Sequence, residues 1–306
     1  MKAAYIDRFG GPEVLQYGDL PDPTAATGEV VVDVAAASVN GADWRVRAGQ
    51  YGQATFPLVL GRDFSGSVAA LGAGVDDLKV GDAVFGVLEA GREGAYAEKL
   101  AVKAAIIAKK PDWPSHVDVA ALALTGLTAI VTLEATLKLK RGETILIRGG
   151  AGGVAGFAIQ LAKHIGARVI VTASAGNLDY VRGLGADEVI DYNAQDFVRV
   201  VSNCDAVFDM VGGEAVQKSF AVLRPGGRAA FIASGPQAPK PDRDDVTALR
   251  PAVGRARAPL ERIVQLVGAG AVRPPQVTLY RLSQAAEAHR LSQSRHFRRK
   301  LVFQVR

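Results

Sequence analysis

The spacing of apolar positions changes near residue 122. Before it, short runs rich in Val, Ala and Phe are separated by Gly and Pro, and few segments have the helical period of about 3.6 residues. These runs predict strands at 30–35, 64–71, 83–87 and 98–102. Short strands separated by turn residues are typical of a rolled antiparallel β domain.

After residue 122, apolar strands alternate with helical stretches. The pattern predicts strands at 144–148, 168–173, 188–191, 206–209 and 228–233, and helices at 154–164, 178–184, 194–201 and 215–223. Alternation with short loops indicates a parallel sheet that helices cover on both faces.

The last part of the chain departs from this alternation. It predicts a helix at 259–267, a strand at 277–280, a helix at 283–292 and a strand at 300–305. We interpret this ending as a return to the first domain. The segment 236–258, rich in Pro, Arg and Asp, is expected to be a surface or mobile loop whose role stays open.

Composition narrows the class of protein. The chain has 306 residues, 49% of them hydrophobic and 22% charged, which suits two modest globular domains. The first residues lack the apolar core of a secretory signal, since Asp7 and Arg8 interrupt it. No apolar run is expected to cross a bilayer. We therefore expect a cytoplasmic protein without a membrane partner.

Cysteine and charge exclude further classes. The single cysteine, Cys204, cannot form an intramolecular disulfide or a cysteine-rich zinc site, and its apolar neighbours predict a structural residue in a buried strand. The net charge is +5, but the basic residues form only loose clusters, near Arg255 and Arg298. We expect no nucleic-acid partner, because no basic stripe with interleaved aromatic residues is present.

The strongest motif is a glycine-rich turn between the strand at 144–148 and the next helix. Gly150-x-Gly152-x-x-Ala155 fits the fingerprint of a dinucleotide-binding turn. Gly150 permits a tight turn, Gly152 lets the backbone approach a pyrophosphate, and Ala155 lets the helix lie against the sheet. The exposed amides at the helix start, which include Gly153 and Val154, then face the phosphates.

The end of the following strand indicates which dinucleotide binds. Enzymes that use NAD place Asp or Glu there, whereas this chain has Ala173 and Ser174. Ser174 and Asn177 can donate hydrogen bonds to a 2′-phosphate, and Arg182 could neutralise part of its charge. We therefore predict NADPH as the cofactor. Alternatively, Ser174 and Asn177 are only turn and helix-capping residues.

Short motifs spread over nearly the whole chain identify a family. They lie at 37–49, 61–68, 80–86, 94–98, 124–129, 160–163 and 184–187, and their order and spacing resemble the zinc-free quinone oxidoreductase (zeta-crystallin-like) branch of the medium-chain dehydrogenase/reductase superfamily. The resemblance implies an α/β protein: a GroES-like, β-rich catalytic domain from 1–122 and 262–306, and a doubly wound Rossmann domain with a parallel sheet from 123–261.

The resemblance also bears on metal chemistry. Zinc alcohol dehydrogenases of the superfamily have a cysteine near the position of Asn40 and a His-Glu pair at Arg62 and Asp63. Neither position suits zinc here, since Asn is a poor ligand and Arg is none. No metal site is expected, and the preferred substrates become quinones and enones, which are electrophilic through conjugation.

Site residues follow from the resemblance. It implies that Asn40 lies beside the nicotinamide or the substrate carbonyl, and that the Tyr51 hydroxyl polarises a carbonyl or donates a proton. It further implies cofactor contacts at Thr125, Thr128, Tyr192, Met210, Val211, Phe231, Ala233 and Lys300. Arg299 replaces a family glycine before Lys300, which puts the local turn in question.

Structural roles are the alternative for several of these residues. Tyr51 could simply cap a loop. Asp43 and Arg47 could form an ion pair that supports Asn40, and Asp63 and Asp82 are expected in turns.

The sequence thus predicts an NADPH-dependent enzyme that transfers hydride to quinones or enones, and the family suggests a homodimer. One alternative is an alkenal or enoyl-thioester reductase. Another is an NADPH-binding structural or regulatory protein without useful turnover.

Overall fold

The computed structural model describes residues 1–51, 54–213, 216–294 and 298–306. These residues divide into two compact units, the first formed by Met1–Leu124, Gly254–Val267 and Pro274–Arg306, the second by Thr125–Val253 and Gly268–Arg273. The division follows contacts between residues and leaves the assignment of a catalytic and a dinucleotide-binding domain as a prediction.

The first unit is built from two β-sheets. A three-stranded sheet has the order β2-β1-β4, and a larger sheet has the order β15-β16-β3-β5-β6-β8, with β7 also pairing with β3. The strands are β1 (Lys2–Ile6), β2 (Gln16–Asp19), β3 (Glu29–Ser38), β4 (Leu58–Val59), β5 (Asp63–Leu71), β6 (Ala83–Val87), β7 (Lys99–Lys103), β8 (Ile107–Lys109), β15 (Val277–Tyr280) and β16 (Lys300–Gln304). All pairs are antiparallel except β15 with β16.

Alternation along β3 explains how this unit fills its core. Val30, Val32 and Val34 are fully buried and pack with Phe64 and Phe303. β-Branched residues at every second position fit a pleated strand that presents one face to a core. The C-terminal strand β16 joins the same sheet, as predicted, because it pairs with the end of β3.

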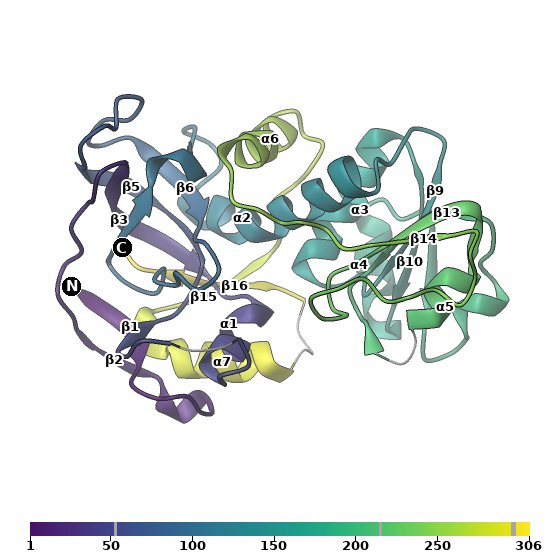
Figure 1. Cartoon of the computed structure of the whole chain (residues 1–306), viewed down its shortest axis with the longest axis horizontal. Helices are drawn as coiled ribbons and strands as arrows, with labels where there is room; N and C mark the ends of the chain where they lie inside the picture. The colour runs from purple at the N-terminus through teal and green to yellow at the C-terminus, as the bar shows by residue number, and fades with distance from the viewer. Residues whose placement is uncertain (52–53, 214–215, 295–297) are drawn as a thin grey trace. The chain divides into compact units, whose positions relative to one another are not determined.

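Helices close the first unit at its ends. They are α1 (Gly41–Arg47), α6 (Arg257–Gly268) and α7 (Ala285–Ser294), and α2 (His116–Ile130) starts in this unit and continues into the second. Helix α7, yellow in Figure 1, lies beside the purple α1, so an early and a late segment of the chain meet here. This contact positions the loop at Asn40.

The second unit is a parallel sheet flanked by helices. Its strand order is β11-β10-β9-β12-β13-β14, and every pair is parallel. The strands are β9 (Thr144–Arg148), β10 (Arg168–Ala173), β11 (Glu188–Asp191), β12 (Cys204–Asp209), β13 (Leu223–Phe231) and β14 (Thr247–Leu249), and the helices α3 (Gly153–Ile165), α4 (Leu178–Gly183) and α5 (Val216–Ala221) lie around them (Figure 1). This order is that of a doubly wound dinucleotide-binding sheet, which confirms the predicted fold class.

Some predicted elements of this unit are wrong. The helix expected at 194–201 is only a 3₁₀ turn, Phe197–Arg199, capped by the Asp196 side chain, which accepts from the Val198 amide. Such local side-chain bonds compete with continued helix. The segment 236–258 is not wholly a loop, since it contains β14. The helix predicted from 215 begins at Val216 among the described residues, because position 215 lies outside them.

The shortest elements of the first unit were not predicted. These are α1, β1, β2, β4 and β8, most of them too short for an apolar period to be recognised.

One expectation about apolar length also needs correction. The helical segment His116–Thr136 is long and apolar enough to cross a membrane by those two criteria alone, and 72% of its apolar window is buried inside the protein. Burial of this extent is what a core helix requires.

Cys204 lies buried at the start of β12, as expected. Burial raises the pKa of its thiol to about 12, so the thiolate does not form at neutral pH.

Candidate active site

The carboxyl edge of the parallel sheet brings together the residues predicted to bind a dinucleotide. In register, Arg148 at the end of β9 lies beside Thr172 of β10 and Asp209 of β12, and Asp209 lies beside Phe231 of β13. The segments that follow these strands therefore leave the sheet at one edge. Between β9 and β12 the strand order reverses, which is where open α/β sheets bind ligands.

Packing of the protein itself requires glycine at position 150. The Gly150 amide donates to the Thr172 carbonyl at 2.9 Å, which holds the turn against β10. A Cβ at this position would lie 2.1 Å from Val171 Cγ1 and 3.2 Å from Thr172 O. Ala155, on the helix that follows, is fully buried. These two small residues let the turn and α3 lie close to the sheet.

Gly152 is different, because none of the described residues requires a glycine there. Its φ of −77° and ψ of 164° suit any residue, and a Cβ would meet only Gly149 O, at 3.8 Å. Gly152 and Gly153 are exposed, and the first amides of α3, at Gly153 and Val154, precede its repeating hydrogen bonds. This open space beside free amides fits the pyrophosphate of a dinucleotide.

The end of β10 presents neutral polar groups. Asn177 Nδ2 donates to Ser174 Oγ at 2.8 Å, and both residues are half-buried. The Ser174 hydroxyl keeps its own proton free to donate, because it accepts in this bond. The Asn177 Oδ1 atom is buried and has no hydrogen-bond partner among the residues that the structure describes. The residues from Ala173 to Asn177 include no Asp or Glu, although Asp191 of β11 lies beside Ala173 in register.

Arg182 and Tyr192, two other candidate cofactor contacts near this strand end, differ in whether their side chains already have partners. Arg182 makes an exposed ion pair with Asp179 at 2.9 Å, so its guanidinium already has an acidic partner. Tyr192 is 55% exposed, and its amide donates to Ala173 O at 3.2 Å, which places it beside the end of β10. Of the two, Tyr192 has the side chain that is free to contact a ligand.

A buried cluster fixes the loop after β12. The guanidinium of Arg148 donates to Asp209 Oδ2 at 2.5 Å and to Ser219 Oγ at 2.9 Å, and Ser219 Oγ donates to Asp209 Oδ2 at 2.7 Å. Asp209 Oδ1 accepts from the amides of Val211 and Gly212 at 2.9 and 3.0 Å. Each Asp209 oxygen therefore has partners, which a buried charge needs.

This cluster holds the loop of Met210 and Val211, which were predicted to line the nicotinamide ribose. Met210 is half-buried and Val211 is 54% exposed. Arg148 and Asp209 were not predicted as site residues. The signal in the sequence was a charged residue at the end of an otherwise apolar strand.

The remaining predicted cofactor contacts of the second unit are less exposed. Thr125 and Thr128 are buried on α2, three residues apart on one helix face. Phe231 is buried as the last residue of β13, and Ala233 is half-buried two residues further on.

Asn40 lies where β3 gives way to α1, in the first unit. Its amide donates to Asp43 Oδ2 at 2.8 Å, and its side-chain Oδ1 accepts from Lys300 Nζ at 2.5 Å. Lys300 Nζ also donates to Val39 O at 2.8 Å. Lys300 was expected to contact the cofactor; the structure places its ammonium on Asn40.

A chain of buried side chains stands behind Asn40. The Tyr96 hydroxyl donates to Asp43 Oδ2 at 2.7 Å, and His289 Nε2 lies 3.3 Å from the Tyr96 oxygen. Arg47 Nη1 lies 3.0 Å from His289 Nδ1. Because a guanidinium can only donate, Nδ1 accepts and Nε2 carries the proton that is donated to Tyr96.

Burial shifts the pKa of each titratable group in this chain. It raises the pKa of Asp43 to about 6, against the hydrogen bonds from Asn40 and Tyr96. It lowers the pKa of His289 to about 3, so the imidazole is neutral. It also lowers the pKa of Lys300, against the favourable charges of Asp63 and Asp43.

The expected ion pair between Asp43 and Arg47 does not form among the described residues. Arg47 instead donates to Gln293 Oε1 at 3.0 Å and to Gly10 O at 3.1 Å, besides His289. The guanidinium thereby joins α1 to α7.

The two aspartates expected in turns differ. Asp63 is fully buried at the start of β5 and accepts from Ser38 Oγ at 2.7 Å, so the expectation is wrong for this residue. Asp82 does lie in a turn, where it accepts from the Lys79 amide at 3.2 Å and pairs with Lys109.

Arg62, which stands where zinc enzymes of the superfamily have a ligand, makes an ion pair with Glu93 at 2.7 Å, and both side chains are largely buried. Among the residues that the structure describes, no cluster of three or more His, Cys, Asp or Glu could hold a metal ion.

Tyr51 lies in the turn after α1 and is 56% exposed. Its hydroxyl oxygen accepts from Arg45 Nη1 at 3.4 Å. This placement leaves the side chain accessible to a ligand.

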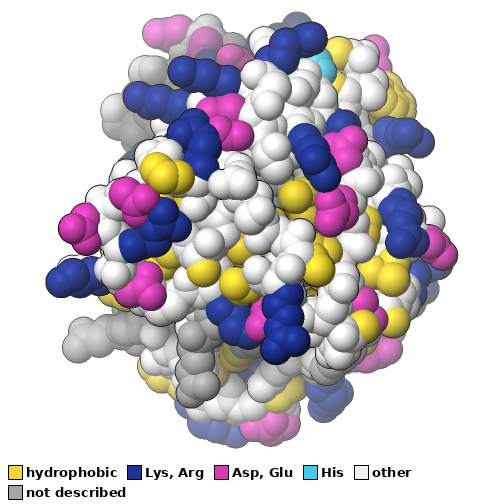
Figure 2. Space-filling model, turned by 90° about the vertical axis from the view of Figure 1, so that its right-hand side faces the viewer, with side chains coloured by type: hydrophobic (Ala, Val, Ile, Leu, Met, Phe, Trp, Pro, Cys, Tyr) yellow, Lys and Arg dark blue, Asp and Glu magenta, His cyan; other side chains and the backbone are white. Residues whose placement is uncertain are grey.

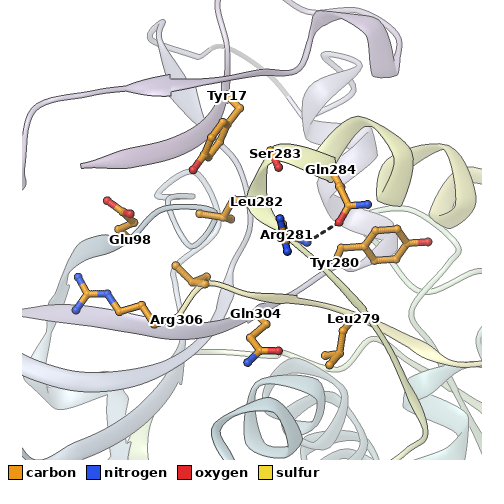
Figure 3. Close-up of a pocket in the computed structure, with 11 residues that line it drawn as sticks. Tyr17, Glu98, Leu279, Tyr280, Arg281, Leu282, Ser283, Gln284, Gln304 and Arg306 are labelled. Carbon is orange, nitrogen blue, oxygen red and sulfur yellow. Dashed lines mark hydrogen bonds between the residues drawn. The ribbon is translucent and has the colours of Figure 1, made fainter.

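A separate cavity in the first unit contains none of the predicted site residues. It has a volume of about 690 Å³ and lies between β2, the segment after β15 and the C-terminus (Figure 3). Tyr17, Glu98 and Arg306 face it from different elements, and the backbone amide of Arg281 donates to Gln284 Oε1 at 2.9 Å beside it.

The charge distribution on one face of the second unit is relevant to the expectation that no nucleic acid is a partner. Figure 2 shows Lys and Arg side chains interspersed with Asp and Glu over it. Ion pairs of this unit, such as Lys163 with Asp187 and Lys218 with Asp196, show the same mixture.

Two family models match the chain. Residues 26–112 match the alcohol dehydrogenase GroES-like domain, and residues 184–303 match a domain described as zinc-binding dehydrogenase. Together they define the class as a medium-chain dehydrogenase/reductase.

Individual relatives define the branch. The chain is 32% identical to a quinone oxidoreductase of Pseudomonas aeruginosa over 92% of each protein. It is 35% identical to the chloroplastic NADPH-dependent alkenal/one oxidoreductase of Arabidopsis thaliana, over 76% of this chain and 62% of that protein.

Solved structures agree. The quinone oxidoreductase from Coxiella burnetii has a TM-score of 0.94 and 34% identity, covering 100% of this chain and 99% of that one. The Escherichia coli quinone oxidoreductase complexed with NADPH has a TM-score of 0.91 and 27% identity, with both chains fully covered. The chain belongs to the zinc-independent quinone oxidoreductase branch of the medium-chain dehydrogenase/reductase superfamily, which confirms the resemblance seen in the sequence.

Proposed function

We propose that this protein is an NADPH-dependent oxidoreductase that transfers hydride to quinones or activated alkenes. The observation that carries the proposal is the glycine turn at the carboxyl edge of the sheet, where Gly152 leaves open space that its own chain does not need. Relatives named quinone oxidoreductase, one of them complexed with NADPH, support the same conclusion.

The residues of the second unit fit NADPH. The amides of Gly153 and Val154 would bind the pyrophosphate at the positive end of α3. Ser174 and Asn177 would bind the 2′-phosphate as neutral donors, with Tyr192 along the adenosine. Met210 and Val211, held by Asp209, would line the ribose of the nicotinamide. When bound, the cofactor supplies the hydride.

The remaining contacts with NADPH are also proposals. Thr125, Thr128, Phe231 and Ala233 are assigned to the cofactor through the family resemblance, and their places on α2 and after β13 are compatible with it.

In the first unit, Asn40 and Tyr51 are the groups proposed to act on substrate. Asn40 Nδ2 is an N–H donor without a protein partner in the described chain, and it can stabilise the oxygen that becomes negative on reduction. The Tyr51 hydroxyl can donate a hydrogen bond or a proton to the same kind of oxygen. Conjugated carbonyl compounds suit these donors, because conjugation already makes them electrophilic.

We further propose that 1–122 with 262–306 form the catalytic domain and 123–261 the Rossmann domain, that the protein is a homodimer, and that it acts in the cytoplasm on a small-molecule substrate. Sedimentation velocity of the purified protein tests the dimer, and a mass of one chain would contradict it.

The assay that tests the function follows nicotinamide absorbance with matched NADPH and NADH. The acceptors are a benzoquinone, a naphthoquinone, an enone, an alkenal, an enoyl thioester and a simple aldehyde, each with and without a chelator. We expect oxidation of NADPH by quinone or enone, unchanged by chelator. Chelator-sensitive reduction of the aldehyde would instead indicate a metal enzyme.

The relative named alkenal/one oxidoreductase favours a second candidate, an alkenal or enoyl-thioester reductase. The same panel separates it, because such an enzyme would reduce the alkenal or thioester and leave the quinones. NADPH binding without turnover of any acceptor would point to a binding protein.

A further inference from the structure

Only the oxygen end of the Asn40 side-chain amide is hydrogen-bonded within the described residues. Its oxygen accepts a hydrogen bond from Lys300 Nζ at 2.5 Å. Its nitrogen, Nδ2, is buried and has no hydrogen-bond partner within the described residues. An ammonium group has only donors, so the oxygen end of the amide must face Lys300 and the NH₂ end must face away.

We propose that Lys300 is a positioning residue, which locks the Asn40 amide so that Nδ2 donates to the carbonyl oxygen of the quinone or enone. This role rests on the proposed function, and it explains how Asn40 Nδ2 is oriented toward the substrate oxygen. Without Lys300 the amide could turn over and present its oxygen, which would repel the negative oxygen that forms on reduction.

The backbone around Lys300 fixes the ammonium at this place. Lys300 is the first residue of β16, which pairs antiparallel with the end of β3, and the Val39 amide donates to Leu301 O at 2.9 Å. A second bond from Nζ to Val39 O, 2.8 Å long, leaves the ammonium little freedom. The sheet thus aligns Lys300 with Asn40 across two neighbouring strands.

The charge of Lys300 strengthens the effect on Asn40. Burial lowers the pKa of the Lys300 amine, and the charges of Asp63 and Asp43 oppose that shift by favouring the charged form. A cation on the amide oxygen draws electron density from the nitrogen, and hydrogen bonds in a chain polarise one another in this way. Asn40 Nδ2 is therefore a better donor than the amide of a solvated asparagine.

A direct contact of Lys300 with a phosphate of the cofactor is the competing role. Two of its three N–H donors are already used within the protein, and the side chain is 7% exposed. These facts favour the positioning role, and the experiment below separates the two.

The test is a double-mutant cycle with Lys300→Met, Asn40→Ala and the double variant. For wild type and each variant, kcat and KM are measured with the best acceptor of the panel, and the Kd for NADPH by calorimetry. We expect each single variant to lower kcat about tenfold or more, since removing an oxyanion donor costs ~100-fold or more in well-studied enzymes. The double variant should be no slower than Asn40→Ala, because Lys300 acts through Asn40.

The expected Kd for NADPH stays within about twofold of wild type in Lys300→Met, since that residue does not touch the cofactor. Lys300→Gln, which can still donate to Asn40 Oδ1, should recover part of kcat. Lys109→Met is the matched control: it removes a strand-end lysine paired with Asp82 and should leave kcat unchanged. If Lys300→Met does not fold, the same cycle is run with Lys300→Gln. Lys300→Gln alone should then lower kcat less than Asn40→Ala does, and the double variant should have the same kcat as Asn40→Ala.

Losses that multiply in the double variant, or a raised Kd for NADPH in Lys300→Met, would overturn the inference while leaving the proposed function intact. Absence of turnover by the wild type with every acceptor would instead overturn the proposed function, and the inference with it.

Discussion

At the scale of single residues, Asp43 links the proposed oxygen-binding residue to the buried side chains behind it. It accepts from the backbone of Asn40 and from Tyr96 through the same oxygen, Oδ2. Its Oδ1 atom is buried and has no partner within the described part of the chain. That incomplete satisfaction explains why burial outweighs the hydrogen bonds and raises the pKa of Asp43 to about 6.

This raised pKa should make the stability of the protein depend on pH. The folded pKa of Asp43 lies above the ordinary value of 3.8, so its contribution to stability is fully present below about pH 4 and is lost as pH rises through about 6. In Asp43→Asn this loss of stability is absent, because the asparagine amide does not titrate. The free energy of unfolding of the variant relative to wild type should therefore rise by on the order of 2–3 kcal/mol between about pH 4 and pH 7, measured by urea unfolding.

Asp82→Asn is the control for that experiment. The hydrogen bond to Lys109 lowers the pKa of Asp82, so this carboxylate contributes stability above its unfolded pKa and loses it as pH falls. The control difference should therefore stay nearly flat from pH 4 to pH 7, since the Asp82 carboxylate titrates below that interval. An Asp43→Asn difference that is flat from pH 4 to pH 7 would contradict the assignment.

At the scale of elements, the turn between β9 and α3 contains two glycines, and each position needs a glycine for a different physical reason. Gly150 faces Val171 of β10 so closely that any side chain would displace the core. Gly152 faces open space at the start of α3. The motif therefore combines a packing requirement with a binding requirement, and sequence alone does not tell which glycine carries which.

Alanine at each position should separate the two. Gly150→Ala should destabilise the protein by about 1–3 kcal/mol through overpacking. Gly152→Ala should keep stability within about 0.5 kcal/mol, yet raise the Kd for NADPH about tenfold or more, because the new methyl group occupies the approach of the pyrophosphate. Thermal unfolding without cofactor and calorimetric titration measure the two effects. Unchanged NADPH affinity in Gly152→Ala would show that the phosphates bind elsewhere.

At the scale of the whole molecule, the family assignment covers the full chain, and the relatives with the same fold include an NADPH complex. A ligand that binds only the folded state stabilises it by about 2.7 kcal/mol at roughly 100 times its Kd. The thermal midpoint of this protein should therefore rise with NADPH.

NADH at the same concentration should raise that midpoint less, because Ser174 and Asn177 then lack the 2′-phosphate as a partner. Adenosine 2′,5′-bisphosphate, which has that phosphate and no nicotinamide, should recover part of the NADPH effect. Equal shifts with NADPH and NADH would contradict the assignment of the 2′-phosphate site to the end of β10.

The sequence alone determined most of the second unit. Strands β9, β10 and β11 were predicted with their observed bounds, because a buried parallel strand is a continuous apolar run and each is followed by a turn or helix with its own signal. The glycine spacing likewise located the turn. Local patterns suffice there, since each property belongs to neighbours in the chain.

Tertiary structure alone decided the surroundings of Asn40. Lys300 lies 260 residues from Asn40, and His289 lies 193 from Tyr96, so no local pattern connects them. Asp63 shows the same limit, because an aspartate near glycine reads as a turn until β3 and β5 bury it against Ser38. The short strand β14 forms only because β13 offers an edge to pair with. Pairings between distant strands set these contacts. Long-range burial, rather than sequence spacing, therefore sets the orientation of Asn40 and the pKa values of the buried groups around it.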